Sequence, residues 1–430
     1  MIRRGGSLWP GSWAVWKIAA ALAMAHAALA MTFAWITPYR QPGWVGDRHL
    51  PDIGAPDEDA HVRYVRHLLE GRGVPSLADP RNLPTYEAHQ PPAYYALAAG
   101  WAHLGGQRDL ARREAGLWLR LLNALIGGVG VVGTAMAGWW GYRSRPAAIA
   151  AASFAALLPM NAALSGAVSN DPILIACGSW TLAFCVLGAR QGWSVRLGLA
   201  AGMVAGLGIA CKTSGLCLLA PLAASLIVAR PPARVWLAAA GTALLLPAPF
   251  WIRNAVLYGD PLLIRTFEVL SAGDALDPDT FRSAGSVLRW LTVVTQYTVR
   301  SFFGLFGYAA IELPWPLLAV GVLLAGWALL GFVRSRRLCP DRDDNRPDLV
   351  LLAFLLAAAV LYARWNLGHF QPQARYLFPA LSAFALVLAR GAERSLGQRA
   401  WVPIVALLLA MDAAALATLP GAFERMLSPP

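Results

Sequence analysis

Charged residues are scarce in this 430-residue chain, and cysteine is rarer still. Only 14% of the residues are charged, whereas 57% are hydrophobic, which is more apolar than a soluble core of this length requires. The five cysteines, at 177, 185, 211, 217 and 339, have no ligand-like spacing and lie outside the long loops described below. Neither a zinc site nor a disulfide framework is therefore expected. The composition predicts a polytopic membrane protein.

Lysine is nearly absent, because only Lys17 and Lys212 occur among the 36 basic residues. The net charge of +12 is spread over many short connections. A nucleic-acid-binding face would need clustered basic residues with interleaved aromatics, and the sequence has no such cluster. Binding of nucleic acid is therefore not expected, and much of the positive charge is a signal of membrane topology.

Apolar runs near the roughly 20 residues that cross a hydrocarbon core predict an all-α bundle of about eleven transmembrane helices. Two of these runs are short, so they could be tilted, kinked or one re-entrant pair. Residues 18–30 resemble a cleavable signal, but the run continues to Ile36, which favours an uncleaved first helix. The runs are 13–36, 117–141, 147–166, 172–189, 197–211, 215–229, 235–251, 314–333, 349–363, 376–390 and 400–419.

Arginine recurs at every second short connection, and such ends face the cytoplasm. The pattern predicts a cytoplasmic N-terminus in an inner or plasma membrane. It places Asp57, Lys212, Arg253 and Arg375 together on the extracytoplasmic side. The bilayer is thus one expected partner. The arginines that set this orientation are Arg3, Arg4, Arg143, Arg145, Arg190, Arg196, Arg230, Arg234, Arg334, Arg336, Arg337, Arg390, Arg394 and Arg399.

Two long outward loops, 37–116 and 252–313, interrupt a chain whose other connections are short. Loops of this length inside a compact domain are usually functional. Within them, residues 57–70, 91–103 and 286–303 have the apolar spacing and boundary residues of short helices at the membrane interface. Residues 1–430 are expected to form one membrane domain with its chemistry in the first loop.

The acidic stretch that opens the first of these short helices has two interpretations. Asp57 or Glu58 could accept a proton from a hydroxyl nucleophile at the membrane surface. Alternatively, the acids only cap the helix and favourably offset its dipole. His61, one turn later, could orient Asp57 or could form an ordinary surface pair with it.

Basic residues on the same predicted face suggest an anionic ligand. Lys212 stands where this arginine-rich chain would otherwise use Arg, so a compact ammonium could hold a phosphate there; a snorkelling side chain is the alternative. Arg253 is either an interfacial anchor or a phosphate ligand. Arg364 and Arg375 flank an outward connection that should be poor in positive charge.

Two further acids stand at helix positions that need an explanation. Asp171 is as well placed to cap a helix as to bind a ligand. Asp412 lies inside the last apolar run, where it should be paired or should face a polar cavity.

Six motifs, listed in chain order at the end of this paragraph, together resemble those of the GT-C superfamily of membrane glycosyltransferases. The likeness is greatest to the bacterial DUF2142 family, and more distant to the protein mannosyltransferases and aminoarabinose transferases. Departures include Asp59 where Pro is common, Gln90 between His89 and the prolines, and Ala374 before Arg375. The motifs are Pro56–His61, Tyr86–Tyr95, Ser169–Asp171, Lys212–Leu216, Arg253–Pro261 and Gln373–Pro379.

This resemblance implies an inverting glycosyltransferase that takes a sugar from a polyprenyl-phosphate donor to a hydroxyl acceptor on a lipid, a glycan or a protein. It implies Asp57, or its rival Glu58, as catalytic base. A phosphate is a good leaving group and needs no general acid, unlike the aglycone of a glycoside hydrolase. The remaining expected site residues are the phosphate ligands Lys212, Arg253 and Arg375, and the supporting residues His61, His89, Tyr94, Asp171, Tyr258 and Tyr376.

No cofactor is expected. A divalent ion on the acidic stretch is the less favoured alternative, because no second acidic cluster is fixed beside the first. A transporter of polyprenyl-linked or anionic solutes is a competing interpretation, but such proteins carry internal repeats and mid-membrane ionisable sites that this sequence lacks. A non-catalytic family member in an envelope-assembly complex is the third.

Overall fold

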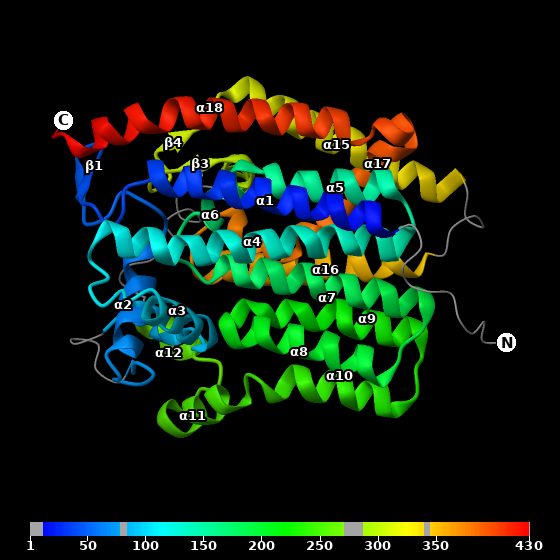
Figure 1. The fold of residues 1–430 in the computed structure, drawn as a ribbon, viewed down its shortest axis with the longest axis horizontal. Coiled ribbons are helices and arrows are strands. Elements are labelled where there is room, and N and C mark those ends of the chain that lie inside the picture. Colours follow the sequence, from blue (N-terminus) through cyan, green and yellow to red (C-terminus); the bar gives the residue numbers. More distant parts are fainter. Residues whose placement is uncertain (1–11, 78–83, 271–286, 339–344, 430) are drawn as a thin grey trace.

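Apolar helices run side by side along the length of the molecule (Figure 1). The computed structural model describes residues 12–77, 84–270, 287–338 and 345–429. Within these ranges seven helical segments are long and apolar enough to cross a membrane, in agreement with the predicted all-α membrane fold. They are α1 (Ser12–Ile36), α4 (Arg113–Tyr142), α7 (Asp171–Gln191), α15 (Trp315–Leu338), α16 (Arg346–Gly368), α17 (Leu381–Leu396) with the preceding 3-10 turn η4 (Ala374–Ala380) and the following η5 (Gly397–Arg399), and α18 (Trp401–Leu427).

Two more predicted runs are bent pairs of helices, which brings the candidate spans to nine. The break between α5 (Arg145–Leu157) and α6 (Pro159–Ser165) is 59°, and that between α10 (Ala233–Leu245) and α11 (Ala248–Tyr258) is 50°. Prolines stand at both breaks, where each removes a backbone donor and crowds the preceding turn. The run predicted over 235–251 therefore bends and continues to Tyr258.

The two short runs are helical as well. They form α8 (Val195–Cys211) and α9 (Leu219–Ala229), joined by the 3-10 turn η3 (Thr213–Leu218). Helix α8 packs mainly on α10 and α7, whereas α9 packs mainly on α7 and α16. All eleven predicted runs are thus helical, although seven to nine satisfy the length and hydropathy expected of a membrane span.

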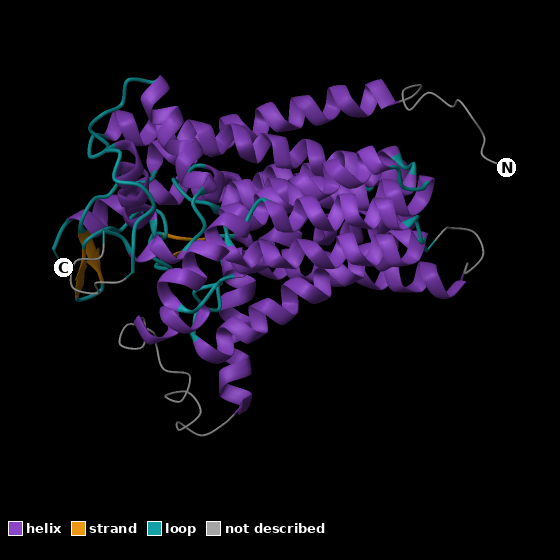
Figure 2. Ribbon diagram, turned by 90° about the horizontal axis from the view of Figure 1, so that it is seen from below, coloured by secondary structure: helices purple, strands orange, loops and turns teal. Residues whose placement is uncertain are grey.

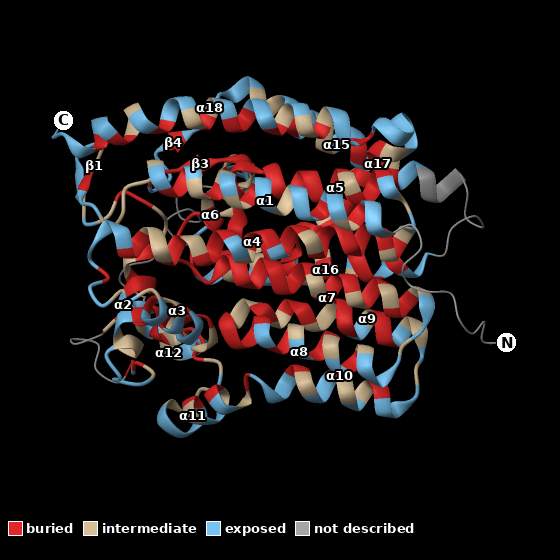
Figure 3. Ribbon diagram, viewed as in Figure 1, coloured by how far each residue is buried: buried red, intermediate tan, exposed pale blue. Residues whose placement is uncertain are grey.

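The buried core lies along α4, α5 and α7, whereas the outer helices expose apolar side chains (Figure 3). Small residues bring α4 and α7 together, since a Cβ on Gly130 would lie 3.2 Å from Ala176, a packing mode common between membrane helices. Leu237, Leu323 and Leu356 are exposed, as expected of a lipid-facing surface. Four cysteines, including Cys177, are buried and free; Cys339 lies outside the described residues.

The loops predicted to be functional gather at one end of the bundle (Figure 2). The first contains a hairpin of β1 (Gly43–Val45) and β2 (Arg48–Leu50), which pairs Trp44 with His49. It continues through the two expected helices and the 3-10 turn between them. These are α2 (Glu58–Leu69), η2 (Tyr86–His89) and α3 (Ala93–Leu104).

The second loop reaches the same end of the molecule. Its described elements include the expected interfacial helix, whose predicted first residue, Ser286, lies outside the described residues. They are α12 (Ile264–Leu270), α14 (Val287–Phe303) and the antiparallel pair of β3 (Leu305–Phe306) and β4 (Ile311–Glu312).

Candidate active site

Asp57 immediately precedes α2 in a left-handed conformation, with φ of 60°. Its side chain makes no capping hydrogen bond to the helix, so the capping interpretation does not describe it. Its carboxylate instead accepts hydrogen bonds from Arg375 and, at 2.5 Å, from the Tyr86 hydroxyl. The backbone turn thereby directs Asp57 away from its own helix, toward η2 and η4.

Arg375 and Tyr86 stabilise the negatively charged form of the Asp57 side chain. Burial by itself would raise the pKa of the carboxyl group, but the positive charge of Arg375 and the hydrogen bond from Tyr86 outweigh burial and hold the pKa below its usual range. Asp57 is consequently ionised at neutral pH, as a general base must be before it accepts a proton.

Asp57 and Asp171 alternate with two cations, Arg375 and Lys212. Lys212, between α8 and η3, lies 2.5 Å from Asp171 at the start of α7. Arg375 reaches both acids, because it donates to Asp57 and its second terminal nitrogen lies 3.9 Å from Asp171. The ring of Tyr376 lies 5.8 Å from the ammonium and 5.2 Å from the guanidinium. Two predicted phosphate ligands are thus neighbours, and Asp171 pairs with a cation.

Glu58, the rival base, points the opposite way. It is fully buried and forms a bidentate ion pair with Arg120, at 2.8 and 2.5 Å. It also accepts a hydrogen bond from the Val168 backbone N–H at 2.8 Å. The Glu58 carboxylate thus has no exposed surface, and its three hydrogen bonds all come from within the protein.

Arg120 is one of the residues that the sequence analysis did not identify, as are Tyr86 and Glu87. It is fully buried and also donates to the carbonyl oxygens of Ala34, Thr37 and Pro38 at the end of α1. The signal was available, because an arginine inside an apolar helix needs a buried partner. Arg120 ties α1, α2 and α4 together beneath the site.

His61 faces a buried polar cluster. Its Nδ1 lies 2.9 Å from the Tyr95 hydroxyl, which donates to Glu87 at 3.2 Å. Glu87 itself lies 3.9 Å from the imidazole. Burial raises the pKa of Glu87. The ring of His61 therefore bonds to α3, and its backbone N–H, not its ring, bonds to the Asp57 carbonyl oxygen.

His89 is the last residue of η2, and its hydrogen bonds favour one tautomer. Its Nδ1–H donates to the Tyr86 carbonyl oxygen at 2.8 Å, and its Nε2 accepts from the Gln90 amide at 2.7 Å. The ring packs on Phe267 of α12 with centroids 3.9 Å apart. Because Tyr86 also bonds to Asp57, His89 fixes the turn that carries one partner of the candidate base.

Two other predicted site residues contact the first loop. Arg253 of α11 donates to the carbonyl oxygens of Val74 and Pro75 in that loop and to the side-chain oxygen of Asn254. Tyr258 binds the first loop too, through a 3.1 Å hydrogen bond from Leu77. A role for Arg253 and Tyr258 in the site stays a prediction.

Three residues outside the central cluster complete the comparison with the sequence. Tyr94 is buried and accepts a 3.0 Å hydrogen bond from Asn123 of α4. Arg364 pairs with Glu268 of α12 at 3.3 Å, so it has a partner within the protein. Asp412 is buried, and neither carboxylate oxygen has a hydrogen-bond partner in the described part of the chain. The expected pairing is therefore not found, and the alternative, that Asp412 faces a polar cavity, stays a prediction.

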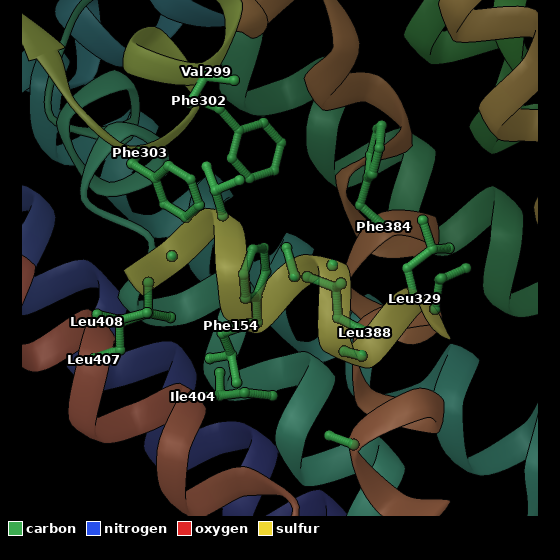
Figure 4. Close-up of a pocket in the computed structure, with 18 of the residues that line it drawn as sticks. Phe154, Val299, Phe302, Phe303, Leu329, Phe384, Leu388, Ile404, Leu407 and Leu408 are labelled. Atoms are coloured by element: carbon green, nitrogen blue, oxygen red, sulfur yellow. The ribbon is translucent and has the colours of Figure 1, made fainter. Parts of the chain in front are cut away.

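An apolar cavity of about 480 Å³ lies between the helices next to η4. Phe302 and Phe303 of α14 face Leu329 of α15, Leu388 of α17 and Leu408 of α18 across it (Figure 4). Leu377 of η4 also lines the cavity, only two residues after Arg375. One short turn therefore contributes to both the charged cluster and the cavity.

The described residues contain no group of three His, Cys, Asp or Glu side chains suited to a metal ion. Asp57 and Asp171 are separated by Arg375, which lies close to both carboxylates.

Comparison with known proteins agrees with this architecture. Residues 89–252 match the family model of dolichyl-phosphate-mannose-protein mannosyltransferases. No curated protein matches the chain significantly. The structure resembles ArnT from Cupriavidus metallidurans bound to undecaprenyl phosphate, with 18% identity over 95% of this chain and 64% of that chain, at a TM-score of 0.56.

An oligosaccharyltransferase from Archaeoglobus fulgidus is also similar, with 15% identity over 95% of this chain and 53% of that chain, at a TM-score of 0.57. The chain thus spans less than two thirds of the length of these solved structures. A closer relation to the DUF2142 family stays a prediction. The chain has the fold of the GT-C superfamily of membrane glycosyltransferases.

Proposed function

We propose that this chain is an inverting glycosyltransferase of the GT-C type, which moves a sugar from a polyprenyl-phosphate donor to a hydroxyl acceptor on the extracytoplasmic face of the membrane. The observation that carries the proposal is the juxtaposition of Asp57 with Arg375 and Lys212 at the loop-bearing end of the bundle. A base and two cations within one cluster are the groups that sugar transfer from a phosphate needs.

In the proposed reaction the Asp57 carboxylate removes the proton of the acceptor hydroxyl. The acceptor oxygen forms a bond to the anomeric carbon while the bond from that carbon to the phosphate oxygen breaks. The electron pair leaves with the phosphate, so the products are the glycosylated acceptor and polyprenyl phosphate. Attack opposite the leaving group inverts the anomeric centre. Cations placed where negative charge develops stabilise the transition state.

Asp57 is proposed as the base in preference to Glu58. The Asp57 side chain is 32% exposed, whereas Glu58 has no exposed surface and is bound on both oxygens by Arg120. A base must come within hydrogen-bond reach of the proton that it removes, and only Asp57 borders solvent.

Lys212 and Arg375 are proposed to hold the donor phosphate. Asp171 would orient the ammonium, and the face of Tyr376 would support both cations. Arg253 is left out because it already donates to loop carbonyl oxygens. We propose that His61, His89, Tyr94 and Tyr258 support the loops that surround the site.

The apolar cavity is proposed to accept part of the isoprenoid tail. It lies among helices that the bilayer would surround, and Leu377 connects it to the turn that bears Arg375. Burial of hydrocarbon against an almost wholly apolar wall contributes roughly 25 cal/mol for each Å² removed from water. This cavity would align the phosphate with the charged cluster.

Transfer is proposed to need no divalent metal, because Lys212 and Arg375 can take up the charge of the leaving group. Dialysis against a chelator should then leave transfer unchanged. Loss of transfer in chelator that Mn²⁺ or Mg²⁺ restores would contradict this part of the proposal.

The test of the function is transfer of labelled sugar from polyprenyl-phosphate donors by the purified protein in nanodiscs. Asp57→Asn should lower the rate by the ~10²–10⁴-fold typical of general base catalysis. Glu58→Gln, which alters the buried neighbour, should act mainly through stability. Near-normal transfer in Asp57→Asn would refute the base assignment, and donor binding that never leads to transfer with any class of hydroxyl acceptor would favour a transporter.

A further inference from the structure

The candidate base, Asp57, and a candidate phosphate ligand, Arg375, form an ion pair with each other in the structure. Arg375 donates through one terminal nitrogen to Asp57 and places the other 3.9 Å from Asp171. Its Nε is buried and has no acceptor within the described residues. Both outward-facing nitrogens therefore already face carboxylates.

A phosphate that binds a guanidinium tightly uses two parallel N–H donors. At Arg375 that geometry requires at least one carboxylate to move away. Asp57 is the more mobile candidate, because its side chain is 32% exposed, while that of Asp171 is 5% exposed and also bound to Lys212. The phosphate and Asp57 are also like charges, so they repel each other at this distance.

We propose that Asp57 competes with the donor phosphate for Arg375, so that donor binding releases the carboxylate to face the acceptor. This inference rests on the proposed function. It makes the Asp57–Arg375 ion pair a latch that links the two substrates. Since coupling between two binding events is reciprocal, the latch favours binding of the donor before activation of the acceptor.

The remaining groups around Asp57 fit this exchange. Tyr86 from η2 donates to the other carboxylate oxygen, while His61 of α2 and Glu87 of η2 lie near enough to influence its charge. None of these contacts requires Arg375, so Tyr86 can retain Asp57 near the site after the latch opens. When Arg375 pairs with the phosphate and no longer with Asp57, the Asp57 carboxylate loses a nearby positive charge and becomes more basic.

The latch predicts that removal of the proposed base strengthens donor binding. The test is the dissociation constant of undecaprenyl phosphate for the purified protein in detergent, compared between wild type, Asp57→Asn and Asp59→Asn. Asp57→Asn should bind at least about fivefold more tightly, the lower range of coupling between two sites, although it no longer transfers sugar.

Asp59→Asn is a matched control for the change of charge. Asp59 lies two residues later, in the first turn of α2, and pairs instead with Arg40 and Arg63, each at 2.6 Å. Its substitution should leave the dissociation constant unchanged. Asn and Gly both tolerate the left-handed backbone of position 57, so Asp57→Gly provides a second variant that should fold and should also bind more tightly.

The outcomes separate the latch from the function. Equal or weaker binding by both Asp57 variants, with measurable binding by wild type, would overturn the latch and leave the proposed function standing. Equal strengthening by Asp59→Asn would also overturn it, because a general charge effect would then suffice. No binding of undecaprenyl phosphate to any variant would instead remove the proposed function on which the latch rests.

Discussion

Two neighbouring acids of the first loop have opposite environments. Glu58 and Arg120 form a framework pair in which both side chains are 0% exposed and the guanidinium also binds three carbonyl oxygens of the α1 end. Asp57 and Arg375 form a site pair in which the carboxylate is 32% exposed and the guanidinium Nε has no hydrogen-bond acceptor among the described residues. The framework pair is fully satisfied, whereas the site pair can exchange partners.

This difference separates stability from chemistry. A buried ion pair with every hydrogen bond made is costly to break, because the remaining charge is left without water. A pair at the edge of solvent can lose one partner and be rehydrated or bound by a ligand. One change of backbone direction at Asp57 places the two functions on adjacent residues.

The largest expected effect comes from breaking the framework pair. Arg120→Met leaves Glu58 buried and unpaired, so the free energy of unfolding should fall by about 3–5 kcal/mol. Arg375→Met, the matched change in the site pair, should cost far less stability because Asp57 reaches solvent. Thermal unfolding in detergent measures both, and equal destabilisation would erase the distinction between the pairs.

Lys212 combines both behaviours, because it pairs with buried Asp171 but is also a proposed phosphate ligand. Lys212→Met should lower transfer by about 10²-fold and should also destabilise the protein. The double variant Lys212→Met with Asp171→Asn should regain stability without regaining transfer. Recovery of transfer in the double variant would assign Lys212 a purely structural role.

Tyr86→Phe tests the site pair from the other side. It removes the 2.5 Å hydrogen bond to Asp57, which helps to hold the pKa of that carboxyl group low. The pKa should rise, so the acid limb of the pH–rate profile should move to higher pH, with transfer near neutral pH reduced by about tenfold or less. An acid limb that stays in place would mean that Asp57 does not control it.

The sequence predicted the helical bundle well, because membrane-length apolar runs are long and strongly patterned. It also identified Asp57, Lys212 and Arg375 as members of one face. It could not choose between Asp57 and Glu58, since the choice depends on a left-handed turn and on Arg120, 62 residues away. It also did not reveal that Arg253 donates to the first-loop carbonyl oxygens of Val74 and Pro75, because topology gives the side of the membrane and not the contacts made there.

Asp412 shows the same limit from within the bundle. Intramembrane acids are normally paired, yet its two oxygens have no hydrogen-bond partner in the described residues. A rule about typical membrane helices predicts the usual environment of a residue type. The packing of particular side chains then determines whether that environment forms.

The effect farthest from the chemistry is on the pH dependence of stability and concerns His89, which adjoins the site pair through Tyr86. Burial lowers the pKa of His89 to about 4, despite the hydrogen bond to the Tyr86 carbonyl oxygen, from an unfolded value near 6.5. The unfolded chain therefore binds the proton more readily, so this contribution to stability is complete above pH 6.5 and is lost as the pH falls toward 4. One such group changes the free energy of unfolding by at most about 1.4 kcal/mol per pH unit.

His89→Gln should flatten the fall of the thermal midpoint between pH 6.5 and 4.5 in detergent, while the other histidines titrate equally in both proteins. Parallel profiles would show that η2 and α12 tolerate a charged imidazole, so His89 would not fix the turn beside Asp57.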